Sequence, residues 1–82
     1  MPESSQQVPA GAEPVVVRAV PIELCQFVKF AGLTGTGGEA KQLIGAGQVR
    51  VNGVVEIRKR RKLAAGDVVE FRGRAVAVKV AQ

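Results

Sequence analysis

The chain has 82 residues, of which twelve are Lys or Arg and seven are Asp or Glu, giving a formal net charge of +5. That length fits one small domain, and a content of 46% apolar residues is enough for one core. The chain lacks His, Tyr and Trp, and its single cysteine, Cys25, excludes an internal disulfide. We expect Cys25 to be a small buried hydrophobic residue. We also expect a monomeric, cytoplasmic protein with no membrane segment.

The first part of the chain has the composition of a tail. Residues 1–13 are rich in Pro, Gly, Ser, Gln and Ala and show no periodicity. We expect a disordered N-terminal tail there, followed by a single domain over residues 14–82. The apolar run within residues 14–18 predicts a short strand at the edge of that domain.

Two helices are predicted next. Apolar residues at helical spacing predict a first helix over about residues 21–31, with Pro21 in its first turn. Thr36 and Glu39 have the spacing of a capping box and predict a second helix over about residues 37–46. Because the connector between them is short, the two helices should pack against each other.

Aromatic residues are few, since Phe27, Phe30 and Phe71 are the only ones in the chain. The chain therefore has too few aromatic side chains for broad stacking on single-stranded bases. We expect Phe30 to lie in the core or at its edge rather than to serve as a stacking platform.

The pattern changes to strands after Gly47. Asn52-Gly53 is a strong hairpin signal between residues 49–51 and 54–57. A two-residue turn would place Arg50 opposite Val55 and would also set an apolar residue opposite Glu56, so we expect a longer loop or a bulge.

Further turns at residues 65–67 and at Gly73 separate two more alternating segments, residues 69–71 and 76–80. The order predicts an α+β fold, in which two short packed helices are followed by a small antiparallel sheet.

The sequence offers little for catalysis. There is no His, the only Asp is Asp67, and Asp67 lies in a turn where it has an ordinary structural role. Residues 35–38 precede a helix as a phosphate-binding loop does, but the G-x-x-x-x-G-K-[ST] spacing is missing. No combination of Cys and His could hold zinc. We therefore expect a protein that is not an enzyme and that needs no cofactor or metal.

The strongest functional signal is the basic segment, which we define as the five consecutive cations Arg58–Lys62. Cations can protect an exposed edge strand from unwanted pairing, but two or three would suffice for that. A run of five repels itself and favours a partner that carries negative charge. The second helix leads directly into the hairpin, so we expect Lys41, Arg50 and the basic segment to share one surface. This pattern favours a nucleic-acid partner.

Four segments of the chain resemble a known family. In order and spacing, residues 24–29, 38–44, 47–53 and 66–69 resemble the S4 RNA-binding domain, which is built on the αL motif. The resemblance covers about residues 21–71 and is closest to the small stand-alone bacterial members. It implies structured RNA as the ligand, ribosomal or transfer RNA, held mainly through its backbone and shape.

The resemblance also implies roles for particular residues. Thr36 and Lys41 would contact RNA from the second helix, and Arg50 would flank the same groove. Many members carry Arg or Lys where this chain has Gly37. The basic segment would therefore have to supply more of the electrostatic attraction for RNA. The residues that we expect to contact RNA are Lys29, Thr36, Lys41, Arg50, Arg58, Lys59, Arg60, Arg61 and Lys62.

Two alternatives stay open. DNA is the less favoured polymer, although charge alone does not distinguish it from RNA. A protein-interaction or ribosome-assembly adaptor could use the same basic face to dock an acidic protein. If the basic segment binds RNA, neutralising Arg58, Lys59, Arg60 and Arg61 together should abolish binding without unfolding the domain.

Overall fold

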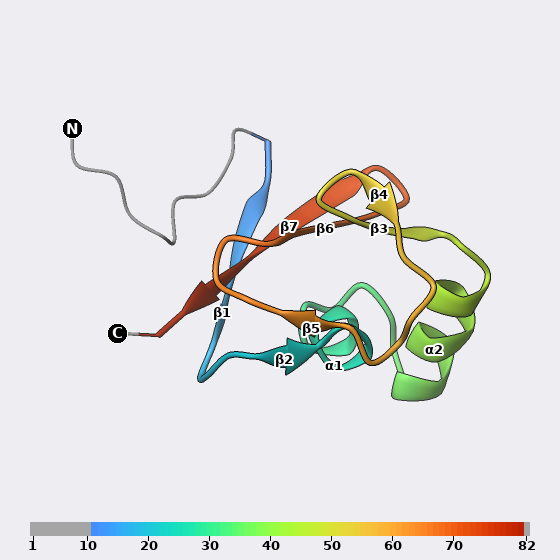
Figure 1. Ribbon diagram of the computed structural model, residues 1–82, viewed down its shortest axis with the longest axis horizontal. Coiled ribbons are helices and arrows are strands. Elements are labelled where there is room, and N and C mark those ends of the chain that lie inside the picture. The colour runs from blue at the N-terminus through green and yellow to red at the C-terminus, as the bar shows by residue number, and fades with distance from the viewer. Residues whose placement is uncertain (1–10, 82) are drawn as a thin grey trace.

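The computed structural model describes residues 11–81, and Figure 1 shows the arrangement of its elements. In the described residues, two short helices follow two strands and precede five more, an α+β fold that confirms the predicted class. The elements in chain order are β1 (Glu13–Val17), β2 (Ile22–Glu23), α1 (Leu24–Phe30), α2 (Gly37–Gly45), β3 (Val49–Val51), β4 (Val54–Val55), β5 (Lys62–Leu63), β6 (Val68–Phe71) and β7 (Arg74–Val80).

Five strands form one sheet in the order β1-β7-β6-β3-β4, and β2 pairs with β5 in a separate two-stranded ribbon. Every pairing is antiparallel except that of β1 with β7, which is parallel and was not anticipated. The two helices lie together on one side of the large sheet (Figure 1). The fully buried side chains that fill the space between these elements include Leu24, Phe27, Val28, Ile44, Val49, Val51, Leu63, Val69, Val76 and Val78.

The N-terminal boundary differs from the prediction. The first ten residues of the predicted tail lie outside the described residues. Glu13, which was assigned to the tail, opens β1 and lies opposite Val76 of β7. Its carboxylate also lies 3.4 Å from Nη2 of Arg74. The predicted edge strand is therefore confirmed, and it begins one residue earlier than expected.

The first helix begins later than predicted. Ile22 and Glu23 are extended because they pair with Leu63 and Lys62 of β5, about forty residues further along the chain. Pro21 therefore precedes the helix rather than occupying its first turn. A contact between segments so distant in sequence overrides the local helical pattern.

The second helix follows its prediction closely, although it ends one residue early. The Thr36 side chain accepts a hydrogen bond from the backbone N–H of Glu39 at 3.1 Å, as an N-cap does. Glu39 reaches back past Thr36, and its Oε1 accepts from the N–H of Gly35 at 2.9 Å. The first contact satisfies an amide in the first turn of α2, and the second ties that turn to the connector before it.

The β3–β4 hairpin has a two-residue turn in place of the longer loop or bulge that the sequence analysis expected. Arg50 lies opposite Val55, and both turn residues are left-handed, with φ of 53° at Asn52 and 82° at Gly53. Two circumstances permit this register. The side chains of β4 are exposed at the sheet edge, so they need not alternate. Glu56, which follows β4, is buried but finds cationic partners. The expected bulge is therefore wrong.

The position of Phe30 also contradicts its prediction. Its side chain is 61% exposed at the end of α1, whereas Phe27 and Phe71 are buried. Within residues 11–81, no helix is long and apolar enough to cross a bilayer.

Candidate nucleic-acid interface

The backbone of the basic segment lies against the start of α1. The N–H of Leu24 donates to the carbonyl oxygen of Arg61 at 2.8 Å, and the N–H of Cys25 donates to that of Lys59 at 3.0 Å. These amides belong to the first turn of the helix and have no partner within it. The segment therefore supplies the acceptors that a capping side chain would otherwise provide.

The buried carboxylate of Glu56 binds two arginines of the basic segment. Its side chain is buried, with 7% of the residue exposed, and it accepts bonds from two arginines. One oxygen, Oε2, accepts from Nε of Arg58 at 2.9 Å and from the backbone N–H of Arg58 at 3.0 Å. The other, Oε1, accepts from Nη2 of Arg58 at 3.0 Å and from Nη1 of Arg61 at 3.1 Å.

This arrangement perturbs the acid strongly. The hydrogen bonds from the Arg58 side chain and backbone lower the pKa of Glu56 from 4.5 to about 2, with a smaller contribution from Arg61. The same pairing raises the pKa of the Arg58 guanidinium. Glu56 is therefore charged at neutral pH and offsets part of the positive charge of the basic segment.

Glu23 offsets a further part of the positive charge of the basic segment. Its Oε2 lies 3.3 Å from Nζ of Lys62 and 3.6 Å from Nε of Arg60. Among the described residues, Lys59 is thus the one member of the basic segment whose side chain forms no ion pair. The five cations of the segment are not equivalent, contrary to the sequence analysis, which treated them as one patch.

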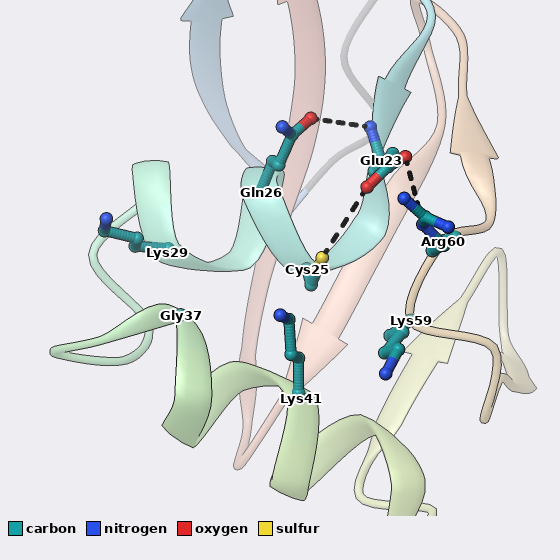
Figure 2. Close-up of a pocket in the computed structure, with 8 residues that line it drawn as sticks. All are labelled: Glu23, Cys25, Gln26, Lys29, Gly37, Lys41, Lys59 and Arg60. Atoms are coloured by element: carbon teal, nitrogen blue, oxygen red, sulfur yellow. Dashed lines mark hydrogen bonds and ion pairs between the residues drawn. The ribbon is translucent and has the colours of Figure 1, made fainter.

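Cations from three parts of the chain meet at one open pocket. Lys29 comes from α1, Lys41 from α2, and Lys59 and Arg60 from the basic segment (Figure 2). The pocket has a volume of about 400 Å³, and its remaining lining residues are Glu23, Cys25, Gln26 and Gly37. We call it the cationic pocket. In Figure 2, Lys41 rises from α2 toward Cys25, and Lys59 projects from the basic segment toward α2.

The charge of the cationic pocket suits an anion as its ligand. Four cations face one carboxylate, and that carboxylate is already paired with Arg60. Lysines gathered in this way repel one another until an anion lies between them. The one thiol, Cys25, is buried and has no His to act as its base. No group of acidic residues or Cys in the described part of the chain could hold a metal ion.

Other predicted site residues lie outside the cationic pocket or form hydrogen bonds that stabilise the fold. Arg50 does not line the cationic pocket, contrary to expectation. It lines a separate hollow of about 250 Å³ with Arg72 at the β6–β7 turn. The Thr36 hydroxyl accepts the capping bond of α2. Arg58 and Arg61 hold Glu56, although the Arg58 side chain remains largely exposed.

Sequence reasoning overlooked Glu56 and Gln26. Glu56 carried a detectable signal, because it stands where the alternation of the hairpin calls for an apolar residue and three arginines follow within five positions. Gln26 carried none, since an exposed Gln on a helix is commonplace.

Known proteins share this sequence and this fold. The sequence model of the S4 domain matches residues 15–79. The chain is 47% identical over 57 residues to "Putative RNA-binding protein YbcJ" of Escherichia coli (strain K12), covering 70% of this chain and 81% of that protein. It is 40% identical over 62 residues to "Probable ribosome maturation protein RlbA" of Bacillus subtilis (strain 168), covering 76% and 87%.

A solved structure agrees with these matches. The solution structure of YbcJ from Escherichia coli, described as having an αL motif involved in RNA binding, superimposes with a TM-score of 0.60. The two sequences are 40% identical in this comparison, which covers 89% of this chain and 90% of YbcJ. The αL arrangement of α1, α2 and the β3–β4 hairpin is thus common to both. The chain belongs to the S4-domain family.

Proposed function

We propose that this protein is a non-catalytic RNA-binding protein that holds structured RNA at the cationic pocket. The observation that carries the proposal is the convergence of Lys29, Lys41, Lys59 and Arg60 from three separate parts of the chain around one pocket. Family membership supports it, because the E. coli relative carries the name "Putative RNA-binding protein YbcJ". The name of the B. subtilis relative favours ribosomal RNA over transfer RNA as the ligand.

The physical chemistry of the pocket agrees with a phosphate backbone as the ligand. Each cation that meets a phosphate releases condensed counterions, so binding gains free energy and weakens steeply with salt. Helical RNA displays phosphates and 2′-hydroxyls on a shallow minor groove, which suits lysines on a rigid support. Such recognition reads shape rather than sequence, as we expect of a surface built from Lys and Arg.

The proposal is tested with Lys41→Gln and Lys59→Gln, alone and together, titrated against a ribosomal RNA fragment and a transfer RNA. Both lysines are exposed and form no ion pair among residues 11–81, so their loss should leave the fold intact. We expect the double variant to bind roughly 10- to 100-fold more weakly, equivalent to about 1.4–2.8 kcal/mol. Each lost contact should also reduce the log–log salt slope by about 0.7–0.9.

Lys79→Gln is the matched control, because it makes the same change of charge on β7, outside the cationic pocket. It should bind like the unmodified protein. Equal losses in Lys59→Gln and Lys79→Gln would show that only net charge matters and would contradict the pocket. Retention on an acidic protein without affinity for either RNA would instead favour the adaptor function.

Neutralising four residues of the basic segment together is no longer a clean test. Arg58 and Arg61 are the partners of buried Glu56, so removing them would leave a buried carboxylate unpaired. A loss of binding in that variant would then reflect a disturbed loop as much as lost contacts with RNA.

A further inference from the structure

Phe30 is the one aromatic side chain of the described residues that lies open to solvent, with 61% of the residue exposed. It ends α1, directly after Lys29. A large exposed ring adds nothing to the core, and a helix end could carry a polar residue there at no cost. Aromatic side chains, Phe included, are enriched at interfaces relative to the rest of a protein surface.

The surroundings of Phe30 form a shallow apolar floor. Two hollows, of about 340 and 470 Å³, adjoin there, and Ile22, Gln26 and Phe30 line both of them. Ile22 is half-buried and packs on the core, so the floor beneath the ring is fixed. The volumes fall within the range of about 300–1,000 Å³ that small-molecule sites occupy, which is ample for one nucleobase.

These hollows continue into the cationic pocket. Lys29 and Gln26 line the larger hollow and the cationic pocket alike. A chain of nucleotides crossing the cationic pocket could therefore place a neighbouring base over Phe30 without leaving the protein surface. This continuity favours the same RNA as the occupant, rather than a separate apolar partner.

We propose that Phe30 stacks on an unpaired nucleobase of the RNA bound at the cationic pocket. The inference rests on the proposed function and specifies its ligand: a structured RNA with an unpaired base, in a loop or bulge, beside the helical part. Unpaired bases splayed from a structured RNA commonly stack on aromatic side chains in this way.

Two neighbouring side chains complete the site. Lys29 would meet the phosphate of the unpaired nucleotide, since its side chain lines both the cationic pocket and the larger hollow. Gln26 accepts a bond from the N–H of Glu23 at 3.4 Å through its carbonyl oxygen. Its amide nitrogen has no partner among residues 11–81 and points away from Glu23 (Figure 2), so it can donate to the edge of a base.

The test compares Phe30→Ala, Phe30→Leu and Phe30→Trp with two synthetic RNAs: a hairpin with an unpaired loop, and its stem alone as a blunt duplex. Removing one stacking contact should weaken binding of the hairpin about 5- to 150-fold in Phe30→Ala. Phe30→Leu should lose nearly as much, because it keeps an apolar surface but no ring. Duplex affinity should hardly change in either variant.

Phe30→Trp adds a direct signal. The chain has no Trp, so the new side chain would be the single indole in the protein. Its emission should be quenched by the hairpin and not by the duplex, at unchanged or tighter affinity. Val16→Trp, on exposed β1, is the control and should not respond.

Several outcomes would overturn the inference. Full hairpin affinity in Phe30→Ala, while Lys41→Gln with Lys59→Gln still weakens binding, would remove the stacking site and leave the proposed function standing. Full affinity in Phe30→Leu would point to apolar docking, as for a protein partner. Failure of the unmodified protein to bind either RNA would instead remove the proposed function itself.

Discussion

At the scale of single residues, Glu56 decides the shape of the candidate site. It occupies a buried position next to an exposed edge strand, and it is tolerated there because Arg58 and Arg61 satisfy both of its oxygens. Those arginines are therefore committed to the fold. Lys59 and Arg60, between them in sequence, are left to face the cationic pocket.

This pairing predicts a pH dependence of stability. The folded-state pKa of Glu56 is lowered to about 2, below its ordinary value of 4.5. Its stabilising effect should be complete above about pH 4.5 and should vanish as pH falls toward 2. Melting temperatures measured across that window should therefore fall further in the unmodified protein than in Glu56→Gln.

Glu39→Gln serves as the comparison, because Glu39 is an exposed carboxylate that makes a single hydrogen bond. If Glu56→Gln and the unmodified protein lose stability in parallel from pH 4.5 to 2, Glu56 does not have the lowered pKa described here.

A second residue-scale prediction concerns Gly37, which lines the cationic pocket at the start of α2. A Cβ there would approach only Cδ of Lys29, at 4.0 Å, so a larger side chain fits. Gly37→Lys should strengthen RNA binding and steepen the log–log salt slope by about 0.7–0.9 for the added contact. The unfavourable charge at a helix start, about 0.3–1 kcal/mol, should be offset by the better helix propensity of Lys over Gly, so stability should change little.

The matched control is Gly45→Lys, at the other end of the same helix, where a Cβ would meet nothing within 4 Å. A salt titration of both variants separates position from net charge. Equal gains in affinity would mean that the cationic pocket has no special role.

At the scale of elements, the β3–β4 hairpin is tied to the turn before β6 by one side chain. Oδ1 of Asn52 accepts from the N–H of Val68 at 2.9 Å, and its Nδ2 donates to Oδ1 of Asp67 at 3.1 Å. Asn also tolerates the left-handed backbone that the turn requires, with φ of 53°. The residue thus serves the turn and the packing of two loops at once.

Substitutions of Asn52 should separate its role in the turn from its hydrogen bonds to Val68 and Asp67. Asn52→Ala loses both hydrogen bonds and strains the backbone, so the free energy of unfolding should fall by about 1–3 kcal/mol. Asn52→Gly also loses the bonds but relieves the strain, so its loss should be smaller. Denaturant unfolding measures both. An unaltered stability in Asn52→Gly would show that the contacts with Val68 and Asp67 contribute nothing.

The elements that could be predicted are those specified by neighbouring residues. Thr36 and its capping bond locate α2, and Asn52-Gly53 locates the hairpin. The start of α1 could not be located in this way, because the pairing of Ile22 with Leu63 makes it extended. The parallel pairing of β1 with β7 depends likewise on contacts between opposite ends of the chain.

At the scale of the whole molecule, the candidate site likewise combines features that the sequence indicates with features that depend on tertiary structure. The sequence supplied its cations, and the resemblance supplied its class of ligand. Which cations remain unpaired depends on how Glu23 and Glu56 are placed, and that follows from tertiary structure alone. Tertiary structure also determines the separation of Arg50 from Lys41 and the exposure of Phe30.

The hydrogen bonds from the start of α1 to the carbonyls of Lys59 and Arg61 have a consequence for binding. A loop that carries cations usually loses conformational freedom when it meets its ligand, and that loss opposes association. Here the loop backbone is already fixed on the start of α1, where Leu24 and Cys25 are buried. Moving it would expose two helix amides and a buried carboxylate together. The cations are therefore presented in a preorganised arrangement, and most of the ordering of the loop is completed when the protein folds rather than when it binds.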